Sequence, residues 1–262
     1  MEDKKGITII CILSIILVIS LFMGIIKDKK INSENQKEYN EWVSSKEDKE
    51  KSDSIENKKE EDSKEQTTVS NFYEKIKNKE DVRILILGDG IALSQGRNSN
   101  NGIWTEGVKW LINEKYGSNV ELVSLAKERT TTAEGNQIVT NNDVSNFDLI
   151  VICYGYNDNS SNENIDNFKE SYTNIINQIK TKSPNGIIIP ILPNYLNKDN
   201  QYRNSIINIA QTYQLTCADM QQKFANCGLA QSKLANGNIP NDLGYQYYTE
   251  TIGEVIEQGV NS

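Results

Sequence analysis

Four short runs of apolar, mostly β-branched residues place the strongest constraint on what this chain can fold into. Runs of this length and composition are typical of strands buried on both faces of a parallel sheet. They occupy residues 82–87, 120–124, 149–154 and 186–192, and a weaker fifth candidate occupies residues 214–218. Because polar, helix-like segments separate these runs, the pattern predicts that strands and helices alternate along the chain.

Two of the intervening segments carry apolar side chains at helical spacing. One predicted face consists of Phe168, Tyr172, Ile175, Ile176 and Ile179, and the other of Ile206, Ile207, Ala210 and Tyr213. A last helix is expected to begin at Asp242, whose carboxylate can cap it, and to end near residue 258. The predicted fold class is α/β, a flavodoxin-like three-layer α/β/α sandwich with a parallel sheet, over residues 81–262.

The N-terminal part of the chain has a different composition. Residues 6–26 carry no charge and are strongly apolar. At about 21 residues this stretch is long enough, as a helix, to cross a hydrocarbon layer of about 30 Å. We therefore expect a transmembrane helix at 6–26 after a short tail at 1–5. The alternative is a cleaved signal peptide, which normally ends at an alanine-rich site, but no alanine precedes Ala92.

Two opposing arguments bear on which side of the membrane the C-terminal part of the chain lies. Lysines flank it on both sides, and their count slightly favours a cytoplasmic C-terminal part. The short N-terminal tail, and the family resemblance described below, favour an outside location. We expect a single-pass membrane protein whose C-terminal domain lies outside the cell.

Residues 27–80 are rich in charged and polar residues and poor in large apolar ones. Such a segment buries too little surface to offset the entropy of ordering it, so a solvated tether is expected, with a charged partner-binding arm as the alternative. The whole chain carries a net charge of -8. This charge argues against nucleic acid as a partner.

Three polar motifs stand beside these predicted elements. Leu-Gly-Asp-Gly at 87–90 and Tyr-Gly-Tyr-Asn-Asp at 154–158 each end an apolar run, and Asn-Gly-Asn-Ile-Pro-Asn-Asp at 236–242 precedes the last helix. Together they resemble the SGNH (GDSL) hydrolase family of esterases and acyl-transfer enzymes, and the resemblance implies the same α/β/α fold. In that family the first motif reads Gly-Asp-Ser with a nucleophilic serine. The last reads Asp-x-x-His, with the histidine as its base.

The family's functional residues are largely replaced in this sequence. Gly90 stands at the serine position, Asn236 at the aspartate position and Ile239 at the histidine position. A backbone glycine of the oxyanion hole aligns loosely with Arg129, whereas the asparagine of that hole is kept as Asn157. The catalytic set is therefore not intact.

These replacements remove the chemistry of a serine hydrolase. A serine hydroxyl needs a base to take its proton, and the members of a triad act as a unit. The chain contains no histidine at all. A Ser-His mechanism is excluded unless another chain supplies the base.

Side chains that remain near the degenerate positions are candidates for ligand binding: Asp89, Arg129, Asn157 and Asp158. Each also has a structural interpretation. The two aspartates are expected to bond loop amides, Asn157 either holds its loop or contacts a ligand oxygen, and Arg129 is either solvated or holds an anion. Gly90 adds loop freedom or space, and Ile239 is expected to pack under the last loop.

No cofactor is expected, because the glycine loop at 88–90 lacks the further glycine and lysine of a phosphate-binding loop. No metal site is expected either. Cys217 and Cys227 can pair if the domain lies outside the cell, or remain free thiols.

Three functions remain open. The leading hypothesis is a membrane-tethered pseudo-hydrolase that binds a ligand or partner at the cell envelope, for example a glycan or acylated polymer. The second is an esterase or acyltransferase that uses Asp89 or Asp158 as base and water or Ser94 as nucleophile. The third is a structural or scaffolding domain.

Overall fold

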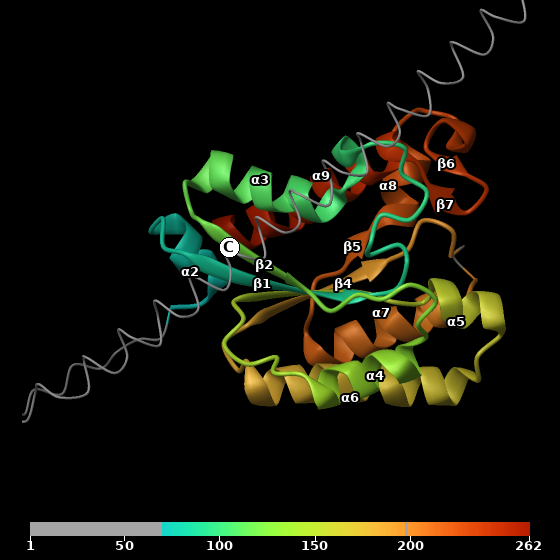
Figure 1. Cartoon of the computed structure of the whole chain (residues 1–262), viewed down its shortest axis with the longest axis horizontal. Coiled ribbons are helices and arrows are strands. Elements are labelled where there is room, and N and C mark those ends of the chain that lie inside the picture. The colour runs from blue at the N-terminus through green and yellow to red at the C-terminus, as the bar shows by residue number, and fades with distance from the viewer. Residues whose placement is uncertain (1–69, 197–198) are drawn as a thin grey trace, which may run out of the picture. The chain divides into compact units, whose positions relative to one another are not determined.

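The computed structural model of the chain describes residues 70–196 and 199–262 (Figure 1). The predicted transmembrane helix at 6–26 and the predicted tether as far as residue 69 lie outside these described residues. Within the described ranges, no helix combines the length and the apolar character that crossing a membrane requires.

A five-stranded parallel sheet lies at the centre, with the strand order β2-β1-β3-β4-β5. The strands are β1 (Val82–Gly88), β2 (Val120–Ser124), β3 (Leu149–Cys153), β4 (Ile187–Leu192) and β5 (Ala218–Asp219). The four main strands confirm the predicted apolar runs to within one residue at each end. The fifth strand is shorter and begins only where the weaker candidate run ends.

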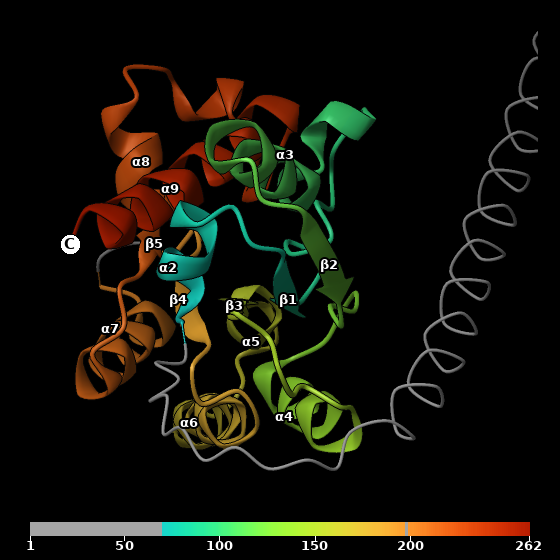
Figure 2. The ribbon, with the colours of Figure 1, turned by 90° about the vertical axis from the view of Figure 1, so that its left-hand side faces the viewer.

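Helices cover both faces of this sheet, as Figures 1 and 2 show. Alternate residues of β1 serve the two faces: Ile84 and Ile86 join one apolar cluster and Leu85 and Leu87 the other. The first cluster is completed by α2 (Phe72–Lys77), α3 (Trp104–Tyr116), α8 (Met220–Asn226) and α9 (Asp242–Asn261). The second is completed by α4 (Thr132–Asn141), α6 (Ile165–Lys182) and α7 (Gln201–Tyr213). The predicted three-layer α/β architecture is confirmed for the described residues.

Short elements connect these layers. They are η1 (Asn100–Gly102), α5 (Tyr156–Ser161), η2 (Gln231–Lys233) and the two strands β6 (Ala235–Asn236) and β7 (Ile239–Pro240), which form an antiparallel hairpin. Figure 1 shows α5 and this hairpin at one end of the sheet and α2 at the other.

Three details differ from the sequence-based expectations: the cap of α9, the buried face of α7 and the helix α2. Asn241 rather than Asp242 caps α9, because the Asn241 side chain accepts the Gly244 amide at 3.1 Å while the Asp242 carboxylate turns toward another loop. In α7 the buried positions include Ile209, whereas Ile207 and Tyr213 are half-exposed.

Residues 72–77, which the sequence analysis places in the tether, form helix α2. Phe72 and Ile76 are buried in the first cluster. These two side chains, one helical turn apart, provide the apolar surface that the residues before them lack.

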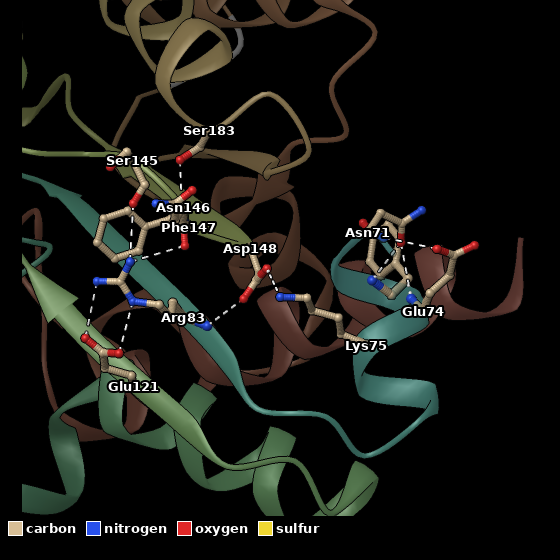
Figure 3. Close-up of polar contacts among 11 residues, drawn as sticks. Asn71, Glu74, Lys75, Arg83, Glu121, Ser145, Asn146, Phe147, Asp148 and Ser183 are labelled. Carbon is tan, nitrogen blue, oxygen red and sulfur yellow. Dashed lines mark hydrogen bonds and ion pairs between the residues drawn. The ribbon is translucent and has the colours of Figure 1, made fainter. Parts of the chain in front are cut away.

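A polar cluster ties the amino ends of the strands together (Figure 3). The Asp148 carboxylate, just before β3, accepts the backbone N–H of Arg83 at 2.8 Å and the Nζ of Lys75 at 2.7 Å. It therefore joins the start of β1 and helix α2 to β3. A carboxylate that accepts from two donors in a partly buried place contributes more than an exposed ion pair does.

The Arg83 side chain extends this cluster to the edge strand. Its guanidinium forms two hydrogen bonds to the carboxylate of Glu121 in β2, at 3.0 and 3.3 Å, and lies 4.5 Å from the centre of the Phe147 ring (Figure 3). The same group donates to the carbonyl oxygens of Ser145 and Asn146. The planar guanidinium suits this combination of bidentate pairing and ring stacking.

We expect Asp148→Ala to lower the free energy of unfolding by about 1–3 kcal/mol, because it leaves the Arg83 amide and the Lys75 ammonium without their acceptor. Lys169→Ala is the matched control, since its ion pair with Asp166 is exposed and is expected to contribute under about 1 kcal/mol. Urea denaturation of both variants measures the difference. Equal losses would contradict the role given to Asp148.

Candidate functional site

The sequence motifs converge at the carboxyl ends of the strands. Asp89 and Gly90 directly follow β1, Asn157 and Asp158 lie in α5 after β3, and Arg129 lies in the loop after β2. In open α/β sheets, ligands bind at this edge. The structure therefore brings the loops of the predicted site to one end of the sheet.

Asp89 holds the first two of these loops together. Its side chain is fully buried, and one carboxylate oxygen accepts the Ile91 amide at 2.9 Å. The other oxygen accepts the amides of Tyr156 and Asn157 at 3.2 and 3.4 Å. The loop after β1 and the start of α5 are thus fixed to each other through one carboxyl group.

Burial and hydrogen bonding act in opposite directions on the pKa of Asp89. Burial raises the pKa of its carboxyl group to about 7, and the nearby charge of Asp158 adds to this rise. The three backbone amides act in the opposite direction but do not cancel the effect of burial.

Asp158 links α5 to α4 in a similar way. It is fully buried, and it accepts the backbone amide of Thr132 at 2.9 Å and the Thr132 hydroxyl at 3.0 Å. Burial is also the main reason that its pKa is raised. Both aspartates thus bond to backbone amides in the folded chain.

Asn157 and Arg129 belong to the same loop system. The Asn157 side-chain amide donates to the backbone oxygen of Thr130 at 3.0 Å, so it holds the loop after β2. Its second amide hydrogen remains available to a ligand. Arg129 is exposed and has a φ of 60°, a left-handed conformation that glycine adopts more readily. This backbone fits the alignment of Arg129 with the family's glycine.

A neighbouring side chain lies beside Gly90, the residue that the motif aligns with the family's serine. A Cβ atom built on Gly90 would overlap the Oε1 of Gln95 and would lie 3.1 Å from its Cδ. The backbone of Gln95 is held on both sides: its amide donates to the Gly90 oxygen at 2.8 Å, and its oxygen accepts from the Tyr245 hydroxyl at 2.6 Å. The carboxamide of Gln95 therefore occupies the space beside Gly90.

Sequence reasoning did not find Gln95, because no motif marks it. The one relevant feature of the sequence is the glycine at position 90. It indicates that space is available beside the loop, but it does not identify the side chain that occupies this space.

The two residues that the last motif aligns with the family's aspartate and histidine face each other in the β6–β7 hairpin. Asn236 is paired with Ile239 across the two strands. Asn236 is exposed, and Ile239 is half-buried. Ile239 packs against the loop after β1, since a Cβ built on Gly96 would lie only 2.5 Å from the Cγ2 of Ile239. It therefore contacts the loop that carries Gln95.

Asp242 pins this same loop from the start of α9. Its carboxylate accepts the Asn98 amide at 2.7 Å and the Ser99 hydroxyl at 2.8 Å. These bonds hold the pKa of Asp242 below its usual range. Asp242, which was predicted to cap the last helix, instead joins the start of this helix to a loop that is distant in sequence.

Two further residues bear on the sequence hypotheses. Ser94 is fully buried with a φ of 57°, and its hydroxyl accepts the Trp104 amide at 3.2 Å. Tyr195, in the loop after β4, stacks edge-on against Tyr156 with the ring centres 4.8 Å apart. The Tyr195 hydroxyl is buried and has no hydrogen-bond partner among the described residues.

Within residues 70–196 and 199–262, no group of three or more histidine, cysteine, aspartate or glutamate side chains is arranged to hold a metal ion. Cys217 and Cys227 are free thiols, so the structure does not contain the disulfide that was one of the two alternatives.

The raised pKa of Asp89 predicts a specific pH dependence of stability. An unfolded aspartate ionises near pH 4, whereas folded Asp89 keeps its proton to about pH 7, so folding takes up a proton between these values. The free energy of unfolding should therefore fall as pH rises through this window, by up to about 1.4 kcal/mol per pH unit. Asp89→Asn should remove this slope in urea denaturation across the pH series.

Asp242→Asn is the control with the opposite sign. The lowered pKa of Asp242 provides stability that is lost as pH falls through its folded value. A difference between wild type and Asp89→Asn that stays constant from pH 4 to pH 7 would contradict the assignment.

The comparisons with known proteins agree with this geometry. The sequence profile of the GDSL-like Lipase/Acylhydrolase family matches residues 86–247. No curated protein matches the chain.

Several solved structures share the fold. A two-domain esterase active on acetylated mannans has a TM-score of 0.62 at 16% identity, covering 72% of this chain and 52% of its own. An acetylxylan esterase from Geobacillus stearothermophilus has a TM-score of 0.57 at 16% identity, covering 67% and 94%. A lipase/acylhydrolase from Enterococcus faecalis has a TM-score of 0.55 at 18% identity, covering 68% and 96%.

This chain thus spans about half the length of the two-domain esterase. The structure of the acetylxylan esterase is that of a catalytic mutant in which a serine is replaced by alanine, and another catalytic mutant of that enzyme replaces a histidine. Because the family profile covers more than half of the sequence, this protein belongs to the GDSL-like lipase/acylhydrolase family.

Proposed function

We propose that this protein is a non-hydrolysing member of its family, which uses the esterase fold to bind a ligand or partner at the cell envelope. The observation that carries the proposal is the absence of both reacting groups. Glycine occupies the serine position, isoleucine the histidine position, and no histidine exists anywhere in the chain. Neither replacement can attack a carbonyl or accept a proton.

The alternative catalytic set receives little support from the local geometry. Ser94 is fully buried and its hydroxyl is engaged by a backbone amide, so it does not face a substrate. Asp89 and Asp158 are also fully buried, and their carboxylates are occupied by backbone and hydroxyl donors. A general base must reach the proton that it abstracts.

A neutral, hydroxyl-rich ligand such as a glycan or acylated polymer fits the groups that remain. The carboxamide of Gln95 offers a donor and an acceptor, is exposed, and has no hydrogen-bond partner for its side chain among the described residues. Nearby, the Tyr156 ring at the start of α5 packs against the Tyr195 ring of the loop after β4. Two of the structurally similar esterases act on acetylated mannans and acetylxylan, which makes such polymers the first ligands to test.

Membrane attachment is the second half of the proposal. It rests on the uncharged apolar stretch at residues 6–26, followed by the charged segment. We propose that the domain is presented outside the cell, where envelope polymers are available to it.

We expect the full-length protein, purified in detergent, to hydrolyse neither p-nitrophenyl acetate nor acetylated mannan above the rate with buffer. The variant Gly90→Ser, Gln95→Ala, Asn236→Asp, Ile239→His should gain measurable turnover. The substitution at Gln95 is included because the end of its side chain lies where the Cβ of the new serine would stand. The new aspartate and histidine would be cross-strand neighbours in the hairpin.

The matched control is the same variant with Gly90 retained, which has the base but no nucleophile. Turnover by the wild-type protein that is lost in Asp158→Asn would overturn the proposal in favour of the rearranged enzyme. Turnover only in the four-residue variant would support it.

Binding is tested separately by calorimetry with acetylated manno-oligosaccharides. We expect the wild-type protein to bind them and Gln95→Ala to weaken binding, because the substitution removes the proposed donor and acceptor. Trp110→Ala is the control, since this tryptophan is exposed and lies within helix α3 rather than in a loop of the site. An absence of binding to these oligosaccharides and to other envelope polymers would favour a scaffolding domain.

A further inference from the structure

The sequence contains three asparagine-glycine pairs, at residues 101–102, 185–186 and 236–237. In such a pair the glycine nitrogen can attack the side-chain carbonyl carbon of the asparagine, because glycine has no Cβ to hinder the approach. The folded structure can slow this reaction by binding the glycine amide or by crowding the turn. The three pairs therefore provide an internal comparison.

Hydrogen bonding separates the three pairs. The Gly186 amide donates to the Ser183 oxygen at 3.0 Å, and the Gly102 amide donates to the Ser99 oxygen at 3.2 Å. The Gly237 amide has no acceptor within the part of the chain that the structure describes. Its nitrogen can therefore react without first breaking a native hydrogen bond.

The packing around the glycine also distinguishes the pair at 236–237 from the pair at 185–186. Gly237 is at the tip of the β6–β7 hairpin with a φ of 63°, and a Cβ built on it meets no atom within 4 Å. Asn236 is exposed. Gly186 is crowded, since its built Cβ would lie 2.6 Å from both the Ile150 side chain and the Phe147 oxygen. Only the hairpin tip combines an unbound amide with open space around it.

We infer that Asn236 is a site of spontaneous deamidation in the folded protein. The deprotonated Gly237 nitrogen forms a bond to the Asn236 Cγ, the bond from Cγ to the side-chain nitrogen breaks, and ammonia leaves. Water then opens the resulting cyclic imide at either carbonyl carbon, which gives aspartate or isoaspartate. The net change replaces the amide nitrogen with oxygen from water, and nothing is oxidised or reduced.

Deamidation of Asn236 would change the β6–β7 hairpin, because this residue is paired with Ile239. Aspartate at residue 236 restores the acidic side chain that the family has at this point, directly opposite Ile239. Isoaspartate adds a carbon to the main chain and disrupts the pairing of residue 236 with Ile239. That change loosens the contact between Ile239 and Gly96, beside the loop that carries Gln95. The inference does not depend on the proposed function.

The test compares deamidation rates in the folded and unfolded states of the full-length protein. The protein is incubated at mildly alkaline pH, in parallel with and without denaturant, and tryptic peptides are followed by mass spectrometry. Asn185 falls between the cleavage sites at Lys182 and Lys198, and Asn236 lies after Lys233, so different peptides report the two. Fragmentation of the second peptide distinguishes Asn236 from Asn238 and Asn241.

The quantity compared is the ratio of the folded rate to the unfolded rate at each site, which removes the influence of local sequence. We expect this ratio to be several-fold higher at Asn236 than at Asn185. Asn236→Gln should abolish the fast mass change of its peptide while leaving the rate at Asn185 unaltered. Equal ratios at the two sites, or a higher ratio at Asn185, would overturn the inference.

Discussion

The buried carboxyl group of Asp89 is the interaction on which the arrangement at the carboxyl end of the sheet depends. It accepts amides from its own loop and from the start of α5, and these segments are distant in sequence. Loops that lack regular structure need such partners for their buried amides, because each unpaired amide carries a desolvation cost. The loop framework of the site is thus held by a group that does not itself need to take part in chemistry.

The other contacts that hold this loop framework also lie outside the two positions that the motifs align with the family's serine and histidine. Asp158 and Asn157 bond to the loop and helix that follow β2, and Asp242 and Tyr245 hold the loop that follows β1. None of these contacts involves Gly90 or Ile239. The side chain of Gln95 lies beside Gly90, and Ile239 packs against Gly96.

Most of the fold was predictable because it rests on local patterns. The four main strands are continuous apolar runs, and the buried face of α6 follows helical spacing without exception. Helix α2 was missed because Phe72 and Ile76, the residues that it buries, belong to a short apolar group at the end of a long charged stretch. The cap of α9 was misassigned because two adjacent residues, Asn241 and Asp242, can both accept an amide, and a distant loop decided between them.

The sequence by itself determined that this chain offers no histidine as a base, because the absence of histidine is a property of composition that no folding can change. It also determined the α/β class, since periodic apolar residues dictate which faces must be buried. Only the tertiary structure decided that Gln95 lies beside Gly90, that burial raises the pKa of Asp89, and that the Gly237 amide is unbound. These properties depend on contacts and burial among segments far apart in the chain, which no local pattern encodes.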